Sequence, residues 1–300
     1  MAVTLAQVPT TELMHKGNLA CAGCPETLAF RHVLKALGEN TIVVNSTGCL
    51  AVVTQMGVPK VPHFHVLLEN GPAVISGIDS GLRMLGRREG VNLLVIAGDG
   101  GTADIGLASL SAALERGEDF IYICLDNESY MNTGGQRSGT TPFGARTSTT
   151  PVGRIERGEQ RMPALRKDMV EIVAAHHIPY VASCSIAYPL HLVEAVQKAA
   201  AVRGPSYFHV HSPCPTGWGM PPAKTIDAAR LAVETGCVVL YEIEDGVRRL
   251  TKRVARVKPV EEYLALQTRF SHLMDDEDVL REIQTDVDTR RETLLASMTR

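Results

Sequence analysis

The sequence predicts an α/β fold, a mainly parallel twisted sheet flanked by helices, over most of its 300 residues. From about residue 41 to residue 244, short β-branched or aliphatic runs alternate with longer segments of helical period, which is the pattern of a parallel sheet covered by helices. A hydrophobic content of 45% can bury a sizeable core. The composition therefore favours one large α/β domain, or two small ones, over a disordered or fibrous chain.

The individual elements follow from this pattern. The expected strands are Thr41–Asn45, Asn92–Ala97, Phe120–Leu125, Tyr180–Ser183, Ser206–Val210 and Val238–Glu242. The expected helices, several with Asp, Ser or Pro near their starts, are Pro72–Leu85, Asp104–Arg116, Lys167–Ala175, Pro189–Val202 and Thr225–Thr235.

Two segments interrupt the alternation. Residues 127–163 are rich in Thr, Gly, Ser, Arg and Pro and lack apolar periodicity, and a loop of that length in a compact domain is often functional. After Lys258 the sequence becomes charged and helix-forming. We therefore expect a main domain of residues 1–257 and a peripheral C-terminal helical arm of residues 258–300.

Charge and hydropathy exclude several classes of protein. A net charge of −3 gives no sign of the strongly basic face that a nucleic-acid-binding protein needs. The N-terminal residues do not form a secretion signal, and the longest apolar runs, such as Val91–Ala97, are too short to cross a bilayer. We expect a cytoplasmic protein without membrane insertion, in which the 7 cysteines serve metal or redox chemistry rather than a disulfide framework.

Two polar motifs stand at the ends of neighbouring expected strands. Gly98-Asp99-Gly100-Gly101 lies between a strand and a helix, so its backbone N–H groups can approach a phosphate. Asn127 follows the next strand, and parallel strands bring their carboxyl ends to one edge of the sheet. Asp99, Asn127 and the backbone carbonyl of Ser129 would suit Mg²⁺ bound to a diphosphate. Taken singly, either motif is equally explained by a helix cap at Asp99 or a turn at Asn127.

Together the motifs resemble those of thiamine-diphosphate enzymes of the transketolase-like superfamily. The run from Asp126 to Gln136, Asp-Asn-Glu-Ser-Tyr-Met-Asn-Thr-Gly-Gly-Gln, is similar to the cofactor loop of pyruvate:ferredoxin oxidoreductases. That resemblance implies that Asn132 lies against cofactor and substrate as a catalytic residue. The residues it implies for thiamine diphosphate are Gly98, Asp99, Gly100, Gly101, Asn127, Ser129, Asn132 and Thr133, with Mg²⁺ on Asp99, Asn127 and Ser129.

The cysteines divide into two groups by context. Cys21-Ala22-Gly23-Cys24 would suit zinc, an iron–sulfur cluster or a redox disulfide, and the pair alone does not decide between them. Cys49 and Cys214 lie in strand-end turns, and the same spacing in the resembling family binds one 4Fe-4S cluster through Cys21, Cys24, Cys49 and Cys214. The remaining cysteines lie in or beside apolar runs and are expected to be buried: Cys124, Cys184 and Cys237.

The resemblance runs from Gly17 to Leu273 and is strongest to the β subunits of multi-subunit pyruvate synthases, on the evidence of Arg137–Pro142 and His211–Trp218. It implies CoA-dependent oxidative decarboxylation of a 2-oxoacid, with pyruvate giving acetyl-CoA and CO₂ or the reverse synthesis, and electrons passing through the cluster to ferredoxin. A branched, aryl or dicarboxylic 2-oxoacid stays open, because Pro25 and Gly101 depart from the pattern of many relatives.

The resemblance also implies partner subunits, because only a diphosphate-binding half is recognisable. An α subunit would bind the pyrimidine of the cofactor, and γ and δ type subunits would carry further clusters. One alternative is a non-oxidative thiamine-diphosphate decarboxylase or ligase subunit whose cysteines hold structural zinc or nothing. Another is a non-catalytic assembly subunit with a degenerate site.

Overall fold

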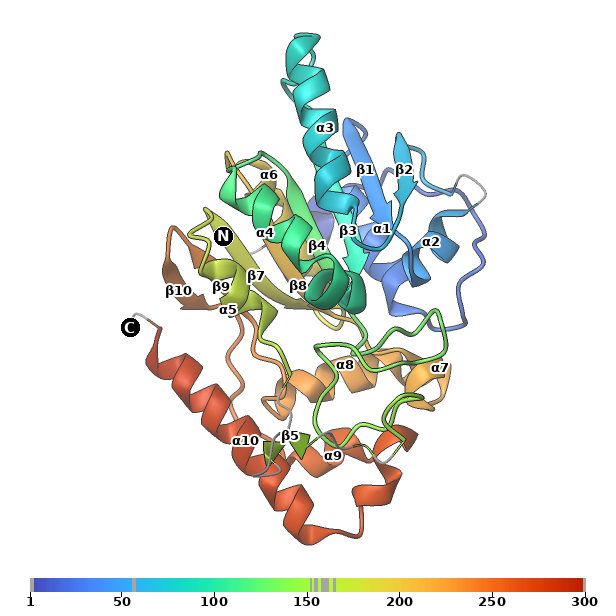
Figure 1. Cartoon of the computed structure of the whole chain (residues 1–300), viewed down its shortest axis with the longest axis vertical. Helices are drawn as coiled ribbons and strands as arrows, with labels where there is room; N and C mark the ends of the chain where they lie inside the picture. Colours follow the sequence, from blue (N-terminus) through green and yellow to red (C-terminus); the bar gives the residue numbers. More distant parts are fainter. Residues whose placement is uncertain are drawn as a thin grey trace.

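The computed structural model describes residues 3–55, 58–151, 153, 156–157, 162–163 and 166–298. At its centre lies an 8-stranded sheet in the order β10-β9-β7-β8-β4-β3-β1-β2 (Figure 1). The pairs from β2 to β7 are all parallel, whereas β9 and β10 pair antiparallel at one edge. The strands are β1 (Thr41–Ser46), β2 (His63–Val66), β3 (Asn92–Gly98), β4 (Ile121–Asp126), β7 (Tyr180–Ser185), β8 (Ser206–His211), β9 (Tyr241–Glu244) and β10 (Val247–Leu250).

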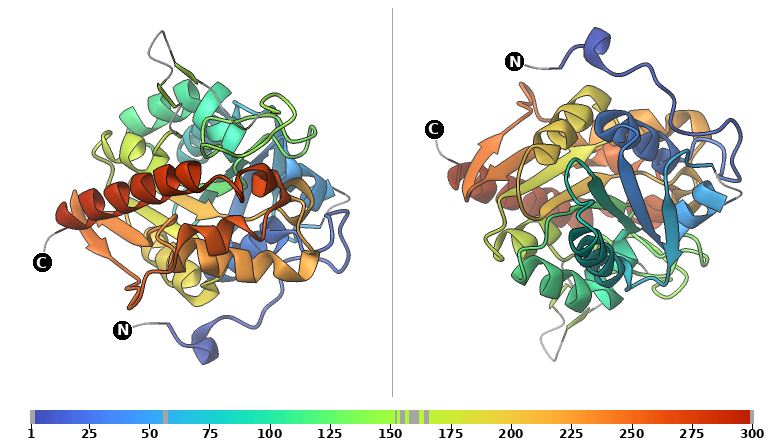
Figure 2. Two further views of the ribbon diagram at one scale, coloured as in Figure 1. Left: turned by 90° about the horizontal axis from the view of Figure 1, so that it is seen from below. Right: turned by 90° about the horizontal axis from the view of Figure 1, so that it is seen from above.

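Helices cover both faces of the sheet, as Figure 2 shows. Successive strand residues point to opposite faces, so Leu94 packs in one hydrophobic cluster and Val95 in the other. The first cluster includes residues of α1 (Pro25–Leu37), α2 (Cys49–Thr54) and α6 (Pro189–Ala200); the second includes residues of α3 (Gly71–Met84), α4 (Leu107–Glu115) and α5 (Met169–Ala174). The predicted fold class, a mainly parallel sheet flanked by helices, is confirmed.

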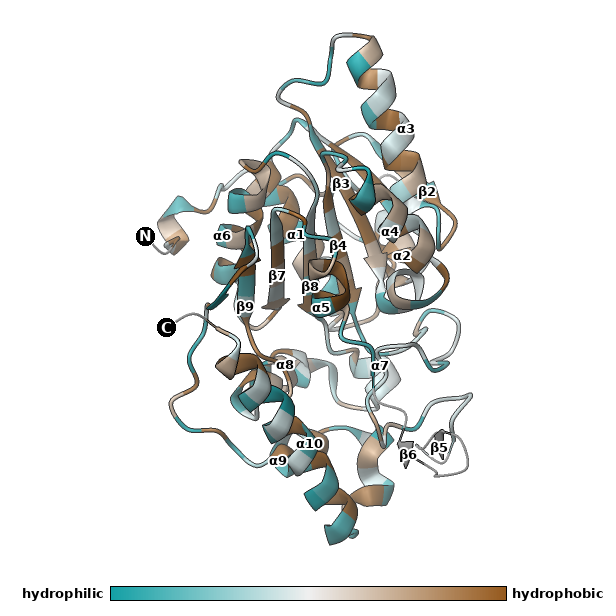
Figure 3. Cartoon of the chain, turned by 60° about the vertical axis from the view of Figure 1, so that its left-hand side comes forward, coloured by the Kyte–Doolittle hydropathy of each residue, from teal (hydrophilic) through white to brown (hydrophobic). Residues whose placement is uncertain are grey.

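A third hydrophobic cluster lies beyond the carboxyl edge of the sheet. It combines residues of α7 (Pro215–Trp218) and α8 (Thr225–Glu234) with residues of α9 (Val260–Leu264), the 3-10 helix η5 (Thr268–Leu273) and α10 (Glu277–Ala296). Hydrophilic residues cover much of α10 (Figure 3), while Val279, Ile283 and Val287 form its buried side. The segment after Lys258 is helical, and its Phe270 is 1% exposed within this cluster. The division into a domain of residues 1–257 and an arm of residues 258–300 stays a prediction.

Several expected elements need correction. The last strand begins at Tyr241 rather than Val238 and forms a hairpin with β10, which was not predicted. Helix α1, helix α2 and the edge strand β2 were also missed. The long loop holds two short strands, β5 (Glu156–Arg157) and β6 (Met162–Pro163), and its residues 152, 154–155 and 158–161 lie outside the described part of the chain. Among the described residues, no helix combines the length and apolar character needed to span a membrane.

Candidate cofactor and cluster site

The two polar motifs meet at the carboxyl edge of the sheet. Strands β3 and β4 are parallel neighbours, with Gly98 opposite Leu125, so Asp99 and Asn127 follow adjacent strand ends. They line one small pocket of about 50 Å³. The residues predicted for the cofactor all line this pocket: Gly98, Asp99, Gly100, Gly101, Asn127, Ser129, Asn132 and Thr133.

The glycines make room for close backbone approach in this pocket. A Cβ atom at Gly100 would collide with the Tyr130 ring, whose hydroxyl donates a hydrogen bond to the Gly100 carbonyl at 3.0 Å. A Cβ atom at Gly101 would lie 3.0 Å from the Leu68 carbonyl oxygen. The chain then enters a π-helical turn, η3 (Gly101–Ile105), a conformation frequent at functional sites.

Two residues that line this pocket, Asn127 and Asp99, carry side-chain oxygen atoms that a cation could bind. The Asn127 Oδ1 atom is buried and has no hydrogen-bond partner, while its Nδ2 donates to Glu26 Oε1 at 2.9 Å. Burial, and then the neighbouring Asp126 carboxylate, raise the pKa of Asp99 well above its usual range. The Thr140 hydroxyl lies between them, 3.0 Å from Asp99 Oδ2 and 2.8 Å from Asp126 Oδ1. A divalent cation would offset the crowded charge and use the free amide oxygen, so the donor set fits Mg²⁺.

The four cysteines predicted as cluster ligands surround a second cavity. Cys21, Cys24, Cys49 and Cys214 all line this space of about 730 Å³. In the described part of the chain, no three His, Cys, Asp or Glu side chains are arranged to hold one metal ion. Four thiols around one cavity are a ligand set that a 4Fe-4S cluster uses.

The surroundings of three of these thiols disfavour the free thiolate. Burial, followed by the nearby Glu26, raises the pKa of Cys24 to about 11. Burial also raises the pKa values of Cys49 and Cys214. Iron ions would stabilise the thiolates that this environment disfavours. By contrast, Cys124 and Cys184 are buried in the sheet, as expected, whereas Cys237 is only half-buried and lines a separate cavity, so its expected burial was wrong.

Glu26 is a site residue that the sequence reasoning missed. It is 3% exposed, lies in the first turn of α1 and lines both the cofactor pocket and the cysteine cavity. Burial raises its pKa to about 7, against the hydrogen bond from Asn127. The sequence places this acidic residue directly after Cys24 and Pro25. Its role could not be predicted, because helix α1 itself was not predicted.

This chain is similar to known proteins that bind thiamine pyrophosphate. The family described as "Thiamine pyrophosphate enzyme, C-terminal TPP binding domain" matches residues 43–210. Pyruvate synthase subunit PorB of Methanothermobacter marburgensis is 53% identical over 274 residues, covering 90% of this chain and 94% of the relative. Ketoisovalerate oxidoreductase subunit VorB of Pyrococcus furiosus is 43% identical over 281 residues, covering 91% and 89%. The chain belongs to the PorB and VorB family of thiamine pyrophosphate enzymes.

A solved structure shares the fold of this PorB and VorB family member. The 2-oxoglutarate:ferredoxin oxidoreductase from Magnetococcus marinus, with 2-oxoglutarate, coenzyme A and succinyl-CoA bound, superposes with a TM-score of 0.58 at 18% identity. The match covers 73% of this chain and 79% of that chain. Family membership confirms the resemblance inferred from the sequence, while the binding roles of individual residues stay predictions.

Proposed function

We propose that this chain is the catalytic β subunit of a 2-oxoacid:ferredoxin oxidoreductase that oxidatively decarboxylates pyruvate to acetyl-CoA and CO₂, or runs the reverse synthesis. The observation that supports this most strongly is a shared wall between the two cavities. The residues lining both the cofactor pocket and the cysteine cavity are Glu26, Cys49, Asn127, Met131 and Asn132. A non-oxidative decarboxylase has no use for thiols placed against its cofactor, whereas an oxidoreductase must move electrons across that wall.

The residues divide the work of holding the cofactor. Backbone N–H groups of Gly98–Gly101, together with Thr133, would hold the diphosphate at the carboxyl edge of the sheet. Asp99, Asn127 Oδ1 and the Ser129 carbonyl would hold Mg²⁺. The bound thiamine diphosphate would supply the carbanion chemistry. Asn132, which is exposed on the shared wall, would contact the substrate.

The cysteine cavity would hold one 4Fe-4S cluster on Cys21, Cys24, Cys49 and Cys214. Its position against the cofactor pocket would let electrons leave one at a time, with coenzyme A accepting the acyl group. Further clusters on γ and δ type subunits would pass the electrons to ferredoxin. An α subunit would complete the active site, since the family match over residues 43–210 is to a C-terminal cofactor-binding domain alone.

Pyruvate is favoured over a branched 2-oxoacid by the relatives. PorB of Methanothermobacter marburgensis is 53% identical to this chain, and VorB of Pyrococcus furiosus is 43% identical. The same chemistry on a branched substrate is the second candidate, because that VorB relative aligns over 91% of this chain.

The test is an anaerobic assay of the complex purified with its partner subunits. Pyruvate and coenzyme A should together reduce a viologen dye, and Asp99→Asn should lower the rate to background. Faster reduction with 3-methyl-2-oxobutanoate than with pyruvate would replace the substrate assignment. Release of CO₂ without dye reduction would overturn the oxidoreductase proposal and favour the non-oxidative decarboxylase.

A further inference from the structure

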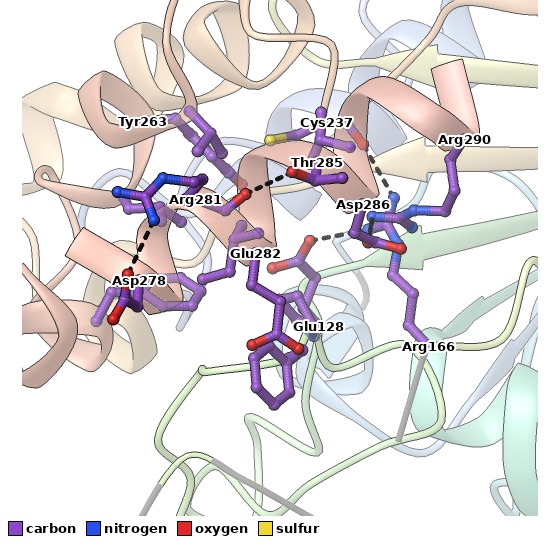
Figure 4. Close-up of a pocket in the computed structure, with 17 residues that line it drawn as sticks. Glu128, Arg166, Cys237, Tyr263, Asp278, Arg281, Glu282, Thr285, Asp286 and Arg290 are labelled. Carbon is purple, nitrogen blue, oxygen red and sulfur yellow. Dashed lines mark hydrogen bonds and ion pairs between the residues drawn. The ribbon is translucent and has the colours of Figure 1, made fainter. Parts of the chain in front are cut away.

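The turn that carries two of the proposed Mg²⁺ ligands has an unusual backbone. Glu128, between Asn127 and Ser129, has a φ of 64°, in the left-handed region that non-glycine residues rarely adopt. Asn127 and Ser129 line the cofactor pocket, whereas Glu128 lines a separate cavity of about 520 Å³, whose lining residues Figure 4 draws. The left-handed residue therefore sends its own side chain away from the cofactor while its two neighbours face it.

The Glu128 carboxylate is anchored by basic side chains from distant parts of the sequence. Its side chain is 3% exposed and forms an ion pair with Arg269, which is 4% exposed. Arg166 is the second basic partner, with its Nη1 3.4 Å from Glu128 Oε1 (Figure 4). A carboxylate so deeply buried is tolerated only with partners of this kind.

Arg269 reaches the same turn by a second route. Its guanidinium stacks over the Trp218 ring, 3.8 Å from the ring centroid, and Trp218 Nε1 donates to the Asn127 carbonyl at 2.9 Å. Gln267 Oε1 accepts from Arg269 Nε at 2.9 Å and from Nη2 at 2.7 Å, which fixes the guanidinium plane. One arginine from η5 thus supports both residues at the start of the turn.

We propose that Arg269 is a positioning residue for the Mg²⁺–diphosphate site, acting through Glu128 and Trp218. The inference rests on the proposed function, since it assigns Asn127 Oδ1 and the Ser129 carbonyl as ligands. The Arg269–Glu128 ion pair keeps the left-handed turn in place, so that Asn127 Oδ1 and the Ser129 carbonyl face Asp99. The C-terminal segment is then part of the cofactor-binding apparatus rather than an appendage.

Other contacts hold the backbone of the turn, among them Asp126 Oδ1, which accepts from the Glu128 N–H at 2.9 Å. The Thr141 hydroxyl donates to the Glu128 carbonyl at 2.6 Å, and Asn127 Nδ2 donates to Glu26. None of these contacts fixes the Glu128 side chain, whose further neighbours beside Arg269 are Arg166 at 3.4 Å and His211 at 3.9 Å. Without Arg269, the Glu128 carboxylate loses its shortest ion pair and keeps only longer contacts, so the left-handed residue is held less firmly and the Asn127 and Ser129 oxygens shift with it.

The test measures binding of thiamine diphosphate with Mg²⁺ to the complex by titration calorimetry, beside the thermal unfolding midpoint of each variant. Arg269→Met should weaken Mg²⁺-dependent binding roughly 10- to 100-fold, the usual effect of removing a residue that orients a ligand. Because Arg269→Met also leaves a buried carboxylate unpaired, the double variant Glu128→Gln with Arg269→Met is needed. It should recover much of the lost thermal stability but not the binding affinity.

Arg290→Met is the matched control. Arg290 lines the same cavity and pairs with Asp286 at 2.7 Å, so its removal should leave cofactor affinity within about twofold of wild type. If the Arg269→Met or the double variant binds as tightly as wild type, the positioning role is wrong while the proposed function stands. If the wild-type complex shows no Mg²⁺-dependent binding, the proposed function fails and the positioning role fails with it.

Discussion

The Asn127 side chain lines the cofactor pocket, where its Nδ2 donates to Glu26 and its Oδ1 is buried without a hydrogen-bond partner. Replacing it with Ala removes the donor to a buried carboxylate. We expect Asn127→Ala to lower the free energy of unfolding by about 1–3 kcal/mol, measured by urea denaturation. Asn132→Ala is the control: it is exposed, so stability should hold within about 0.5 kcal/mol while turnover falls. Equal stability losses would contradict this account.

The buried His211 makes the free energy of unfolding depend on pH, and its lowered pKa fixes the sign of that dependence. Burial lowers its pKa from 6.5 to about 4 in the folded chain. Since the unfolded chain takes up the proton at higher pH, stability is full above about pH 6.5 and falls towards pH 4, by up to about 3 kcal/mol. His211→Gln should flatten the dependence of stability on pH across this window. An unchanged slope in His211→Gln would refute the assignment.

The residues of the candidate site were largely predictable from the sequence. The residues predicted for the cofactor stand in short motifs at strand ends, and parallel topology brings such ends together, so local patterns were enough to predict that they line one pocket. Glu26 and Arg269 were not predicted. Their importance depends on contacts across long stretches of chain, from Glu26 to Asn127 and from Arg269 to Glu128, which no local pattern reports.

At the scale of elements, the turn after β3 depends on the absence of a side chain at Gly100. We expect Gly100→Ala to destabilise the chain by about 1–3 kcal/mol, because the new methyl group meets the rigid Tyr130 ring. Gly98→Ala has open space within 4 Å and should change thermal stability little. Comparable losses in the two variants would show that backbone freedom, rather than the Tyr130 contact, determines the choice of glycine.

The helix α1 and the strand β10 were not predicted, although short sequence features mark where each begins. Asp245-Gly246 between β9 and β10 is a strong hairpin turn, with φ values of 48° and 80°, but β10 is too short and charged to read as a strand. Pro25 departs from the pattern of many relatives, and it occupies the first position of α1, where proline is favoured.

For the molecule as a whole, the third hydrophobic cluster joins the C-terminal segment to the cofactor-binding part. Phe270 is 1% exposed in this cluster, so Phe270→Ala should cost about 3–5 kcal/mol of unfolding free energy. Met84→Ala, at a residue 88% exposed, should cost less than about 0.5 kcal/mol. Chemical denaturation of both variants measures the difference; a small effect at Phe270 would mean that the C-terminal segment is an independent arm after all.

The proposed 4Fe-4S cluster would be held beside the thiamine diphosphate site by four cysteines from the N-terminal loop and two strand ends, which line one cavity. The most direct measurement is the iron and acid-labile sulfide content of the anaerobic complex, with its EPR spectrum after pyruvate is added, for wild type, Cys49→Ser and the buried control Cys184→Ser. To resolve this cluster from those of partner subunits, the wild-type and variant spectra are subtracted. The account predicts that Cys49→Ser loses about four iron atoms per chain and the corresponding reduced-cluster signal, while Cys184→Ser keeps both. Equal iron and equal signals in Cys49→Ser and wild type would contradict it.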